Sequence, residues 1–312
     1  MKTRPFKQVD VFSAVPYLGN PLAVVLDGTD LSSEQMQQFA HWTNLSETTF
    51  LLPPSQAGAA AGADYRVRIF TPAAELPFAG HPTLGSCHAW LEAGGAHNAK
   101  DEIIQECAVG LVRIRRDGTR LAFAAPPLQR SSPNPALLAQ VTAALGLKPY
   151  QILTAQLLDN GPVWLGLLLD STETVLQLTP DHLALQHIGQ KVGVAAVEPA
   201  PVATNLIARS NREARAFGPR STELALALAA STEFEVRAFA APVGIQEDPV
   251  TGSLNASLAQ WLIADGHAPS AYVASQGTCL GRAGRVHLAQ DTAGQVWVGG
   301  DATTCIDGSV NL

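Results

Sequence analysis

The chain has 312 residues, of which 46% are hydrophobic and 15% charged, and its formal net charge is −7 at pH 7. This length predicts two domains, and the negative charge argues against a protein that binds nucleic acid through a basic surface. The longest strongly apolar stretch, 162–169, is too short to span a membrane, and four scattered cysteines without an apolar leader indicate a cytoplasmic protein.

The first part of the chain is predicted to consist of short strands and two helices. Ser32 starts the first helix, in which Met36, Phe39 and Ala40 share one face. The Ala/Gly-rich run 56–63 is expected to be a surface loop, and a strongly apolar second helix begins near residue 80. Strands are expected at residues 9–12, 22–26, 45–52 and 65–70, with three more between 103 and 123.

The second part of the chain is also predicted to combine short strands with few helices. Helices are expected from Pro135, after the cap Asn134, to the residue before Gly146, from 179 onwards, at 222–230 and at 252–264, where the helix is again strongly apolar. Strands are expected at residues 152–157, 163–169, 192–197, 203–208, 234–239, 272–274, 285–288 and 296–298.

The segment 126–133, rich in proline and serine, is the most linker-like part of the chain. We therefore predict an N-terminal domain at 1–128 and a C-terminal domain at 129–302. The final strand, at about 303–312, could join the N-terminal domain. The active site is expected in the cleft between the two domains.

Two segments 172 residues apart resemble each other. In both, the order is a loop, a glycine followed by a polar residue, an apolar helix, a second glycine and strands, which predicts a duplicated chain. An apolar helix must be enclosed, and a curled sheet can enclose it; the sequence therefore predicts two α+β domains. The matched pairs are Glu75 and Glu247, Gly80 and Gly252, Gly94 and Gly266, and Cys107 and Cys279.

Polar residues stand at the beginning of both apolar helices. Gly80 and His81 begin the first helix, and Gly252 and Ser253 begin the second. The free N–H groups and the positive end of the helix dipole at such a position can hold an anion. The alternative is an ordinary N-cap, in which Thr251 or Ser253 closes the first helical turn.

Three side chains are candidates for acid and base chemistry. Glu47 precedes the apolar residues 50–52, and a carboxyl group near a hydrophobic wall has its pKa raised towards a useful value; the alternative is an exposed strand glutamate. His81 could donate a hydrogen bond or carry a proton, or it could simply cap a surface turn. Asp248, before Pro249, could be only a turn residue.

Metal and nucleotide sites are not predicted from the sequence. The other histidines show no paired spacing with carboxylates or thiols, and glycine-rich phosphate loops of the Walker or dinucleotide type are absent. We therefore expect no metal and no cofactor.

Several ordered motifs resemble the phenazine-biosynthesis PhzF-like family of isomerases, and the match runs nearly from end to end. These motifs are Asp10-Val11-Phe12 with Gly19-Asn20-Pro21, Asn44-Leu45-Ser46-Glu47-Thr48, Gly80-His81-Pro82-Thr83, Glu247-Asp248-Pro249-Val250-Thr251-Gly252-Ser253, Gln276-Gly277 and Val298-Gly299-Gly300-Asp301-Ala302.

The resemblance implies an α+β, diaminopimelate epimerase-like fold of two pseudo-symmetric domains, each a mostly antiparallel sheet rolled around a central helix. It implies cofactor-independent isomerisation of a small anionic substrate, a dihydro-hydroxyanthranilate, and a homodimer. Glu47 would be the general acid and base, with His81 and Asp248 beside it. The implied substrate-binding residues are Gly80, Pro82, Thr83, Gly252 and Ser253.

One departure from related proteins and two alternative functions bear on this expectation. The related epimerases use paired cysteines at the two helix starts, whereas this chain has Gly80-His81 and Gly252-Ser253 there, so cysteine-based racemisation is not expected. An epimerase of an amino or hydroxy acid, using Glu47 and Asp248, is one alternative. A non-catalytic small-molecule binder on the same fold is the other.

Overall fold

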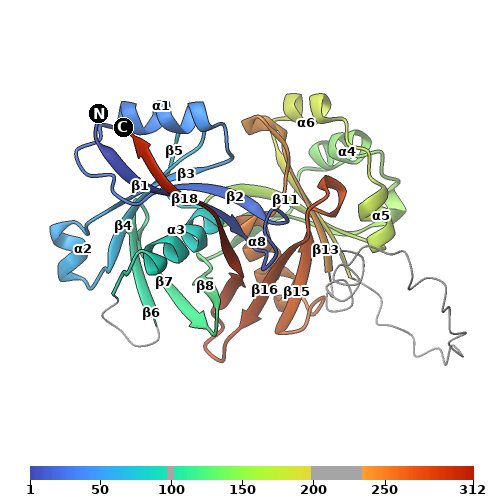
Figure 1. Cartoon of the computed structure of the whole chain (residues 1–312). Helices are drawn as coiled ribbons and strands as arrows, with labels where there is room; N and C mark the ends of the chain where they lie inside the picture. Colours follow the sequence, from blue (N-terminus) through green and yellow to red (C-terminus); the bar gives the residue numbers. More distant parts are fainter. Residues whose placement is uncertain (97–101, 198–233) are drawn as a thin grey trace, which may run out of the picture.

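The computed structural model describes residues 1–96, 102–197 and 234–312 (Figure 1). The strand predicted at 203–208 and the helix predicted at 222–230 lie outside these residues. The helices are α1 (Ser33–Thr43), α2 (Gln56–Ala60), α3 (Gly80–Glu92), α4 (Pro135–Ala144), α5 (Thr172–Gln177), α6 (His182–Ile188) and α8 (Gly252–Ala264). Short 3₁₀ turns lie at Pro149–Gln151, Ala241–Val243 and Thr278–Leu280.

The strands of the N-terminal half are β1 (Thr3–Val11), β2 (Asn20–Val25), β3 (Thr48–Leu52), β4 (Tyr65–Phe70), β5 (Glu75–Leu76), β6 (Glu102–Cys107), β7 (Gly110–Asp117) and β8 (Arg120–Ala124). Those that follow are β9 (Gln129–Ser131), β10 (Ile152–Asp159), β11 (Val163–Leu169), β12 (Lys191–Val197), β13 (Phe234–Ala240), β14 (Ile245–Asp248), β15 (Ala271–Gln276), β16 (Gly284–Gln290), β17 (Val296–Gly300) and β18 (Ala302–Asn311).

The two halves have the same strand topology. In the N-terminal half β1, β2, β3, β4, β6, β7 and β8 are neighbours in that order, and the pairings β2–β3 and β4–β6 are parallel while the others are antiparallel. In the C-terminal half β10, β11, β12, β13, β15, β16 and β17 repeat this order, with β11–β12 and β13–β15 parallel. The repeated order confirms the predicted duplication.

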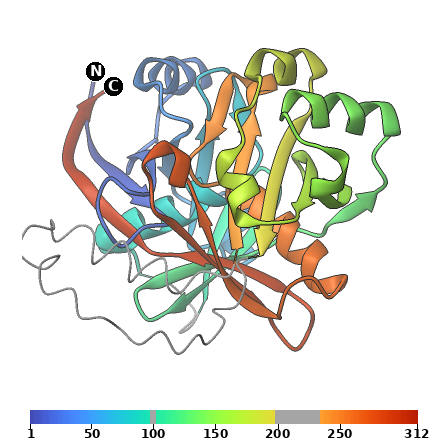
Figure 2. The same cartoon turned by 90° about the vertical axis from the view of Figure 1, so that its right-hand side faces the viewer.

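Each half gives its last strand to the other half. β8 pairs with β17 and joins the two sheets, after which β9 pairs with β10 and β18 pairs with β1. The two chain ends consequently lie side by side, as Figure 1 shows, and Lys2 N–H donates to the Leu312 carbonyl oxygen at 2.6 Å. Figure 2, a view turned by 90°, also shows β18 (red) running alongside β1 (dark blue). The domain boundary near residue 128 stays a prediction.

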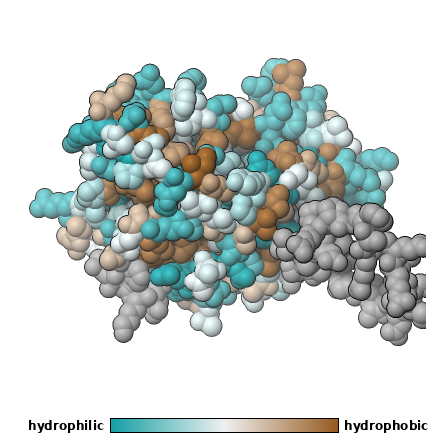
Figure 3. Space-filling model, viewed as in Figure 1, coloured by the Kyte–Doolittle hydropathy of each residue, from teal (hydrophilic) through white to brown (hydrophobic). Residues whose placement is uncertain are grey.

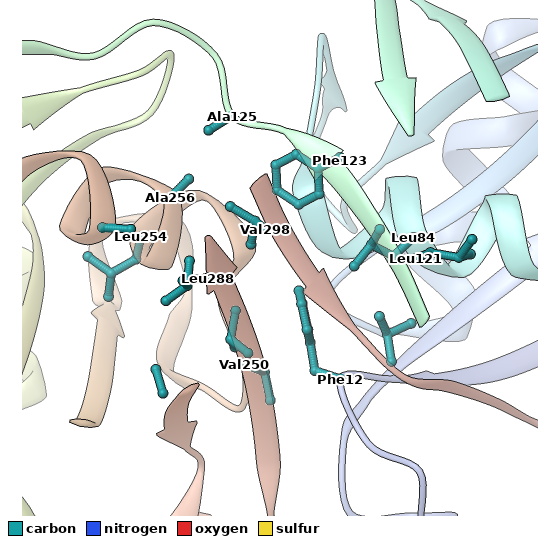
Figure 4. Packing of buried hydrophobic residues seen from close by; sticks show 14 of the residues in the cluster. Phe12, Leu84, Leu121, Phe123, Ala125, Val250, Leu254, Ala256, Leu288 and Val298 are labelled. Atoms are coloured by element: carbon teal, nitrogen blue, oxygen red, sulfur yellow. The ribbon is translucent and has the colours of Figure 1, made fainter. Parts of the chain in front are cut away.

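The two apolar helices occupy the core. In each of α3 and α8, nine of the 13 residues are buried. Gly94 and Gly266 follow the two helices with φ of 88° and 74°, a conformation that favours glycine and ends each helix. Side chains from both halves form one buried cluster, in which Phe123 and Val298 lie between the two helices (Figure 4).

The prediction of a surface loop at 56–63 was wrong in part, because residues 56–60 form the helix α2. Ser55 caps this short helix by accepting from the Gly58 N–H at 2.9 Å. The Glu106 carboxylate accepts from the Ser55 N–H and hydroxyl at 2.7 and 2.6 Å. A cap and a carboxylate together stabilise a helix start, but Glu106 is 51 residues away in the chain and could not be assigned to Ser55 beforehand.

The surface seen in Figure 3 is mainly polar outside the grey segments, and its hydrophobic residues lie in small separate patches. Within the described residues, no helix is both long enough and apolar enough to cross a membrane.

Candidate active site

The starts of α3 and α8 differ from those of the other described helices. Side chains cap α1, α2, α4, α5 and α6. Ala79 and Thr251, at the N-cap positions of α3 and α8, make no side-chain cap. The first N–H groups of both helices therefore stay available to a ligand. The alternative in which the side chain of Thr251 or Ser253 closes the first turn of α8 is therefore wrong, although Thr251 does occupy the N-cap position.

The two uncapped helix starts meet. A Cβ atom built on Gly252 would lie 3.1 Å from the Gly80 Cα and 3.1 Å from the His81 nitrogen. Because both neighbours are backbone atoms, no side chain can turn aside to make room. Glycine at these positions lets the positive ends of two helix dipoles face one place, where an anion would be stabilised.

The partly buried Glu47 and the buried His81 form a pair at this place. Glu47, which directly precedes β3, is 16% exposed in its side chain, and its Oε2 lies 3.0 Å from His81 Nδ1. His81 Nε2 lies 3.0 Å from the Asn20 carbonyl oxygen. A carbonyl can only accept, so Nε2 carries a hydrogen. The short contact to Glu47 then needs one more proton, either on Nδ1 with ionised Glu47 or on the Glu47 carboxyl.

Asp248 lies at the end of β14, close to this pair. Asn20 Nδ2 donates to its Oδ1 at 3.0 Å, and the Thr251 hydroxyl donates to its Oδ2 at 2.6 Å. Burial, and next the negative charge of Glu47, raise the pKa of Asp248 to about 6, although these hydrogen bonds and His81 act in the opposite direction. Asn20 therefore connects Asp248 in one half with His81 in the other.

Gln276, at the end of β15, sets the direction of the Thr251 hydroxyl. Its Nε2 donates to Thr251 Oγ1 at 3.0 Å, and its Oε1 accepts from the Thr251 N–H at 3.0 Å. Since Thr251 Oγ1 already accepts a hydrogen from Gln276, its own proton is directed to Asp248. Asn255 donates to the same Gln276 Oε1 at 2.7 Å. The network keeps Asp248 in place as a hydrogen-bond acceptor.

Comparison with known proteins assigns the chain to a family. A family model described as "Phenazine biosynthesis-like protein" (PhzC-PhzF) matches residues 9–308. The chain belongs to this family. Antisense-enhancing sequence 1 of Schizosaccharomyces pombe is 35% identical to this PhzF-family chain, with 99% of each chain covered. Trans-2,3-dihydro-3-hydroxyanthranilate isomerase of Pseudomonas aeruginosa is 33% identical, with 97% of this chain and 98% of the relative covered.

Solved structures agree with this assignment at the level of the fold. A phenazine biosynthesis protein of the PhzF family from Bacillus anthracis superimposes with a TM-score of 0.78 at 20% identity, with both chains covered completely. A probable proline racemase from Agrobacterium radiobacter has a TM-score of 0.59 at 14% identity, covering 99% of this chain and 93% of its own. The predicted α+β epimerase-like fold is thus confirmed, and the family relationship makes the chain an isomerase.

The predicted site residues of this PhzF-family chain fall into three groups. Glu47, His81 and Asp248 are linked through Asn20, and Gly80, Gly252 and Ser253 stand at the two facing helix starts. Pro82 and Thr83 are buried one step further into α3. The Thr83 hydroxyl donates to the Ala79 carbonyl at 2.9 Å and accepts from Gln105 at 3.1 Å. The catalytic and binding roles of all these residues stay predictions.

Sequence reasoning assigned no role to Asn20, Gln276 or Trp164. Asn20 and Gln276 stand in motifs of the family resemblance, which was the only available signal for them. Trp164 donates from its indole N–H to Ser253 Oγ at 3.2 Å across 89 residues of sequence, and no local pattern marks that contact. Among the residues that the structure describes, no group of three His, Cys, Asp or Glu side chains could hold a metal ion.

Proposed function

We propose that this protein is a cofactor-independent isomerase that moves a proton between two carbons of a small carboxylated substrate. The proposed substrate class is a dihydro-hydroxyanthranilate, the class named for the relative from Pseudomonas aeruginosa. The observation that carries the proposal is the Glu47–His81 contact of 3.0 Å beside two uncapped helix starts. A carboxyl group for proton transfer thus stands next to a place that suits the substrate carboxylate.

Glu47 is the proposed general base and then the general acid. With His81 as imidazolium, Nδ1 donates to Glu47 Oε2, which leaves Oε1 to take the proton from a substrate carbon. Glu47 then returns this proton to a different carbon, which moves the double bond and completes the isomerisation. Glu47 is 16% exposed in its side chain, so its proton can exchange with water before it is returned.

The facing helix starts are proposed to stabilise the transition state. Removal of a proton beside an unsaturated acid spreads negative charge towards the substrate carboxylate. Free N–H groups of Gly80, Gly252 and Ser253 at the two helix starts are already oriented when this charge develops. Asp248, with two hydrogen-bond donors fixing its oxygens, is proposed to hold the substrate amine.

An epimerase of an amino or hydroxy acid is the second candidate. The raised pKa of Asp248, about 6, has Glu47 as one of its causes, so two carboxyl groups act on one site. Two such groups on opposite sides of one carbon would remove a proton from one face and return it to the other.

Replacement of Glu47 tests the proposal. Glu47→Gln keeps the size of the side chain but cannot take a proton, so turnover of trans-2,3-dihydro-3-hydroxyanthranilate should fall by about 10²- to 10⁴-fold while binding is preserved. In deuterated water, the wild type should place deuterium on a new carbon of the product. Glu75→Gln, which changes a carboxylate paired with Arg68 at the surface, is the control and should behave as wild type.

The outcomes separate the candidates. Unchanged turnover in Glu47→Gln removes Glu47 from its role. Deuterium exchange with inversion at a single carbon identifies the epimerase, and wild-type binding without turnover or exchange identifies a binder. A homodimer and a cytoplasmic location are also proposed, and light scattering of the purified protein at micromolar concentration decides the first.

A further inference from the structure

Trp164 and Asn160 together hold Ser253 at the start of α8. Trp164, on β11, is 3% exposed, and its indole N–H donates to Ser253 Oγ at 3.2 Å. Asn160, in the turn between β10 and β11, is 7% exposed and donates from Nδ2 to the Ser253 carbonyl oxygen at 3.1 Å. Both contacts come from one hairpin, which therefore fixes the backbone and the side chain of Ser253.

The Trp164 contact determines where the Ser253 proton can point. An indole N–H can only donate, so Ser253 Oγ is the acceptor and its own single proton points away from the indole. The described part of the chain shows no acceptor for this proton. Ser253 is partly exposed, whereas Gly252 and Leu254 on either side are buried. The hydroxyl is thus presented as a donor on the open side of the helix start.

The other half of the molecule holds its corresponding residue in a comparable way. His81 is the second residue of α3, as Ser253 is of α8. Asn20, the first residue of β2, accepts from His81 through its carbonyl oxygen, and the β1–β2 hairpin corresponds to β10–β11 in the repeated topology. In each half the first hairpin therefore orients the second residue of the central helix.

We propose that Trp164 is a positioning residue that makes Ser253 a hydrogen-bond donor and so selects a carboxylate at the two helix starts. The inference rests on the proposed function, because it assumes that the substrate carboxylate lies there. An ionised carboxylate accepts at both oxygens. A carboxamide must turn its NH₂ group towards a helix N–H, which is itself a donor, or towards the one lone pair that Trp164 leaves on Ser253 Oγ, and the Ser253 proton then has no acceptor on that group.

A pair of ligands and a double-mutant cycle test this inference. Isothermal titration with anthranilate and with 2-aminobenzamide, which differ only in the carboxylate, is carried out on wild type, Trp164→Phe, Ser253→Ala and the double variant. Trp164→Phe keeps an aromatic ring at this position, at the cost of some packing, and removes the N–H. The substitution should lower the affinity for anthranilate about 3- to 10-fold and reduce the ratio of the affinities for anthranilate and 2-aminobenzamide. In the Ser253→Ala protein it should have no further effect on either affinity.

Trp297→Phe is the matched control, because its indole N–H donates to Asp291, away from the two helix starts. It should leave both affinities unchanged. A measurement on the wild type alone complements the variants. Anthranilate should shift the indole N–H resonance of Trp164 and leave that of Trp297 in place.

Four results would overturn the inference. Equal weakening by Trp164→Phe with and without Ser253 would show that the indole acts through packing. Unchanged anthranilate affinity, or an unmoved Trp164 resonance in a protein that binds anthranilate, would show that the N–H has no influence; either leaves the proposed function standing. Failure of the wild type to bind anthranilate at millimolar concentration would remove the anion site itself, and with it both proposals.

Discussion

Asp248 gives the site a defined dependence on pH. Burial and the charge of Glu47 raise the pKa of Asp248 to about 6, so the carboxylate that would bind a substrate amine is present above pH 6 and is lost as the pH falls below it. The affinity for a ligand with an ammonium group should therefore fall by up to about tenfold between pH 7 and pH 5. Calorimetric titration with 2-aminocyclohexanecarboxylate measures this change.

Two controls separate Asp248 from the other titrating groups, Glu47 and His81, that face it. Cyclohexanecarboxylate lacks the ammonium group, and protonation of a nearby carboxylate can only reduce its repulsion, so the affinity of its anion, corrected for protonation of the free acid, should not fall at low pH. In Asp248→Asn, the ratio of the two affinities should no longer depend on pH. Parallel pH profiles for the two ligands in the wild type would contradict the role of Asp248.

At the scale of residues, sequence reasoning found candidates but not their partners. From its sequence context Glu47 could also be an exposed strand glutamate, and its pairing with His81, 34 positions further along the chain, depends on the three-dimensional fold. The Asn20 carbonyl that sets the His81 tautomer is a backbone atom, which no residue pattern identifies. Local sequence shows which groups can do chemistry, whereas long-range packing decides which of them meet.

At the scale of elements, the site depends on how closely the starts of α3 and α8 approach each other. Gly252→Ala would put a Cβ 3.1 Å from the backbone of Gly80 and His81, so the two helix starts must move apart. We expect a loss of about 1–3 kcal/mol in the free energy of unfolding, typical of overpacking, together with a weaker affinity for carboxylates. Chemical denaturation and calorimetric titration measure these two effects.

Gly308→Ala is the matched control for this substitution. An added Cβ at Gly308, on β18, has no heavy atom within 4 Å, and the residue does not have a positive φ. Its stability and affinity should match those of the wild type. A Gly252→Ala protein with unchanged carboxylate affinity would show that the close approach of the helices is not needed for anion binding.

The elements themselves were largely predictable, and the sequence analysis allowed for the return of the final strand to the N-terminal half, but the crossing of β9 to the C-terminal half was not predicted. Apolar periodicity indicated α1, α3, α8 and most strands, and the glycines after α3 and α8 marked where those helices end. Ser171, which caps the short helix α5, was overlooked. The pairing of β9 with β10 depends on the three-dimensional path of the chain after β8, which residue patterns do not encode.

At the scale of the whole molecule, the exchanged strands and the shared core tie the halves together. β18 crosses back to pair with β1, and the buried Lys7 on β1 forms ion pairs with Asp307 on β18 at 2.7 Å and with Glu92 on α3 at 3.1 Å. One buried cluster contains side chains of both halves. Separate unfolding of either half would therefore expose core surface of the other.

We therefore expect a single cooperative unfolding transition, with coincident far-ultraviolet circular dichroism and tryptophan fluorescence curves in urea. Lys7→Met should lower the free energy of unfolding by about 0.5–1 kcal/mol and shift both curves equally, because two carboxylates that are 70% and 40% exposed lose their shared ammonium group but remain partly solvated. Lys2→Met removes an exposed pair with Asp30 from the same strand region and should change stability by less than about 0.5 kcal/mol. Two separated transitions, or a Lys7→Met shift in one signal only, would show that the halves unfold independently, and the shared core would then not couple them.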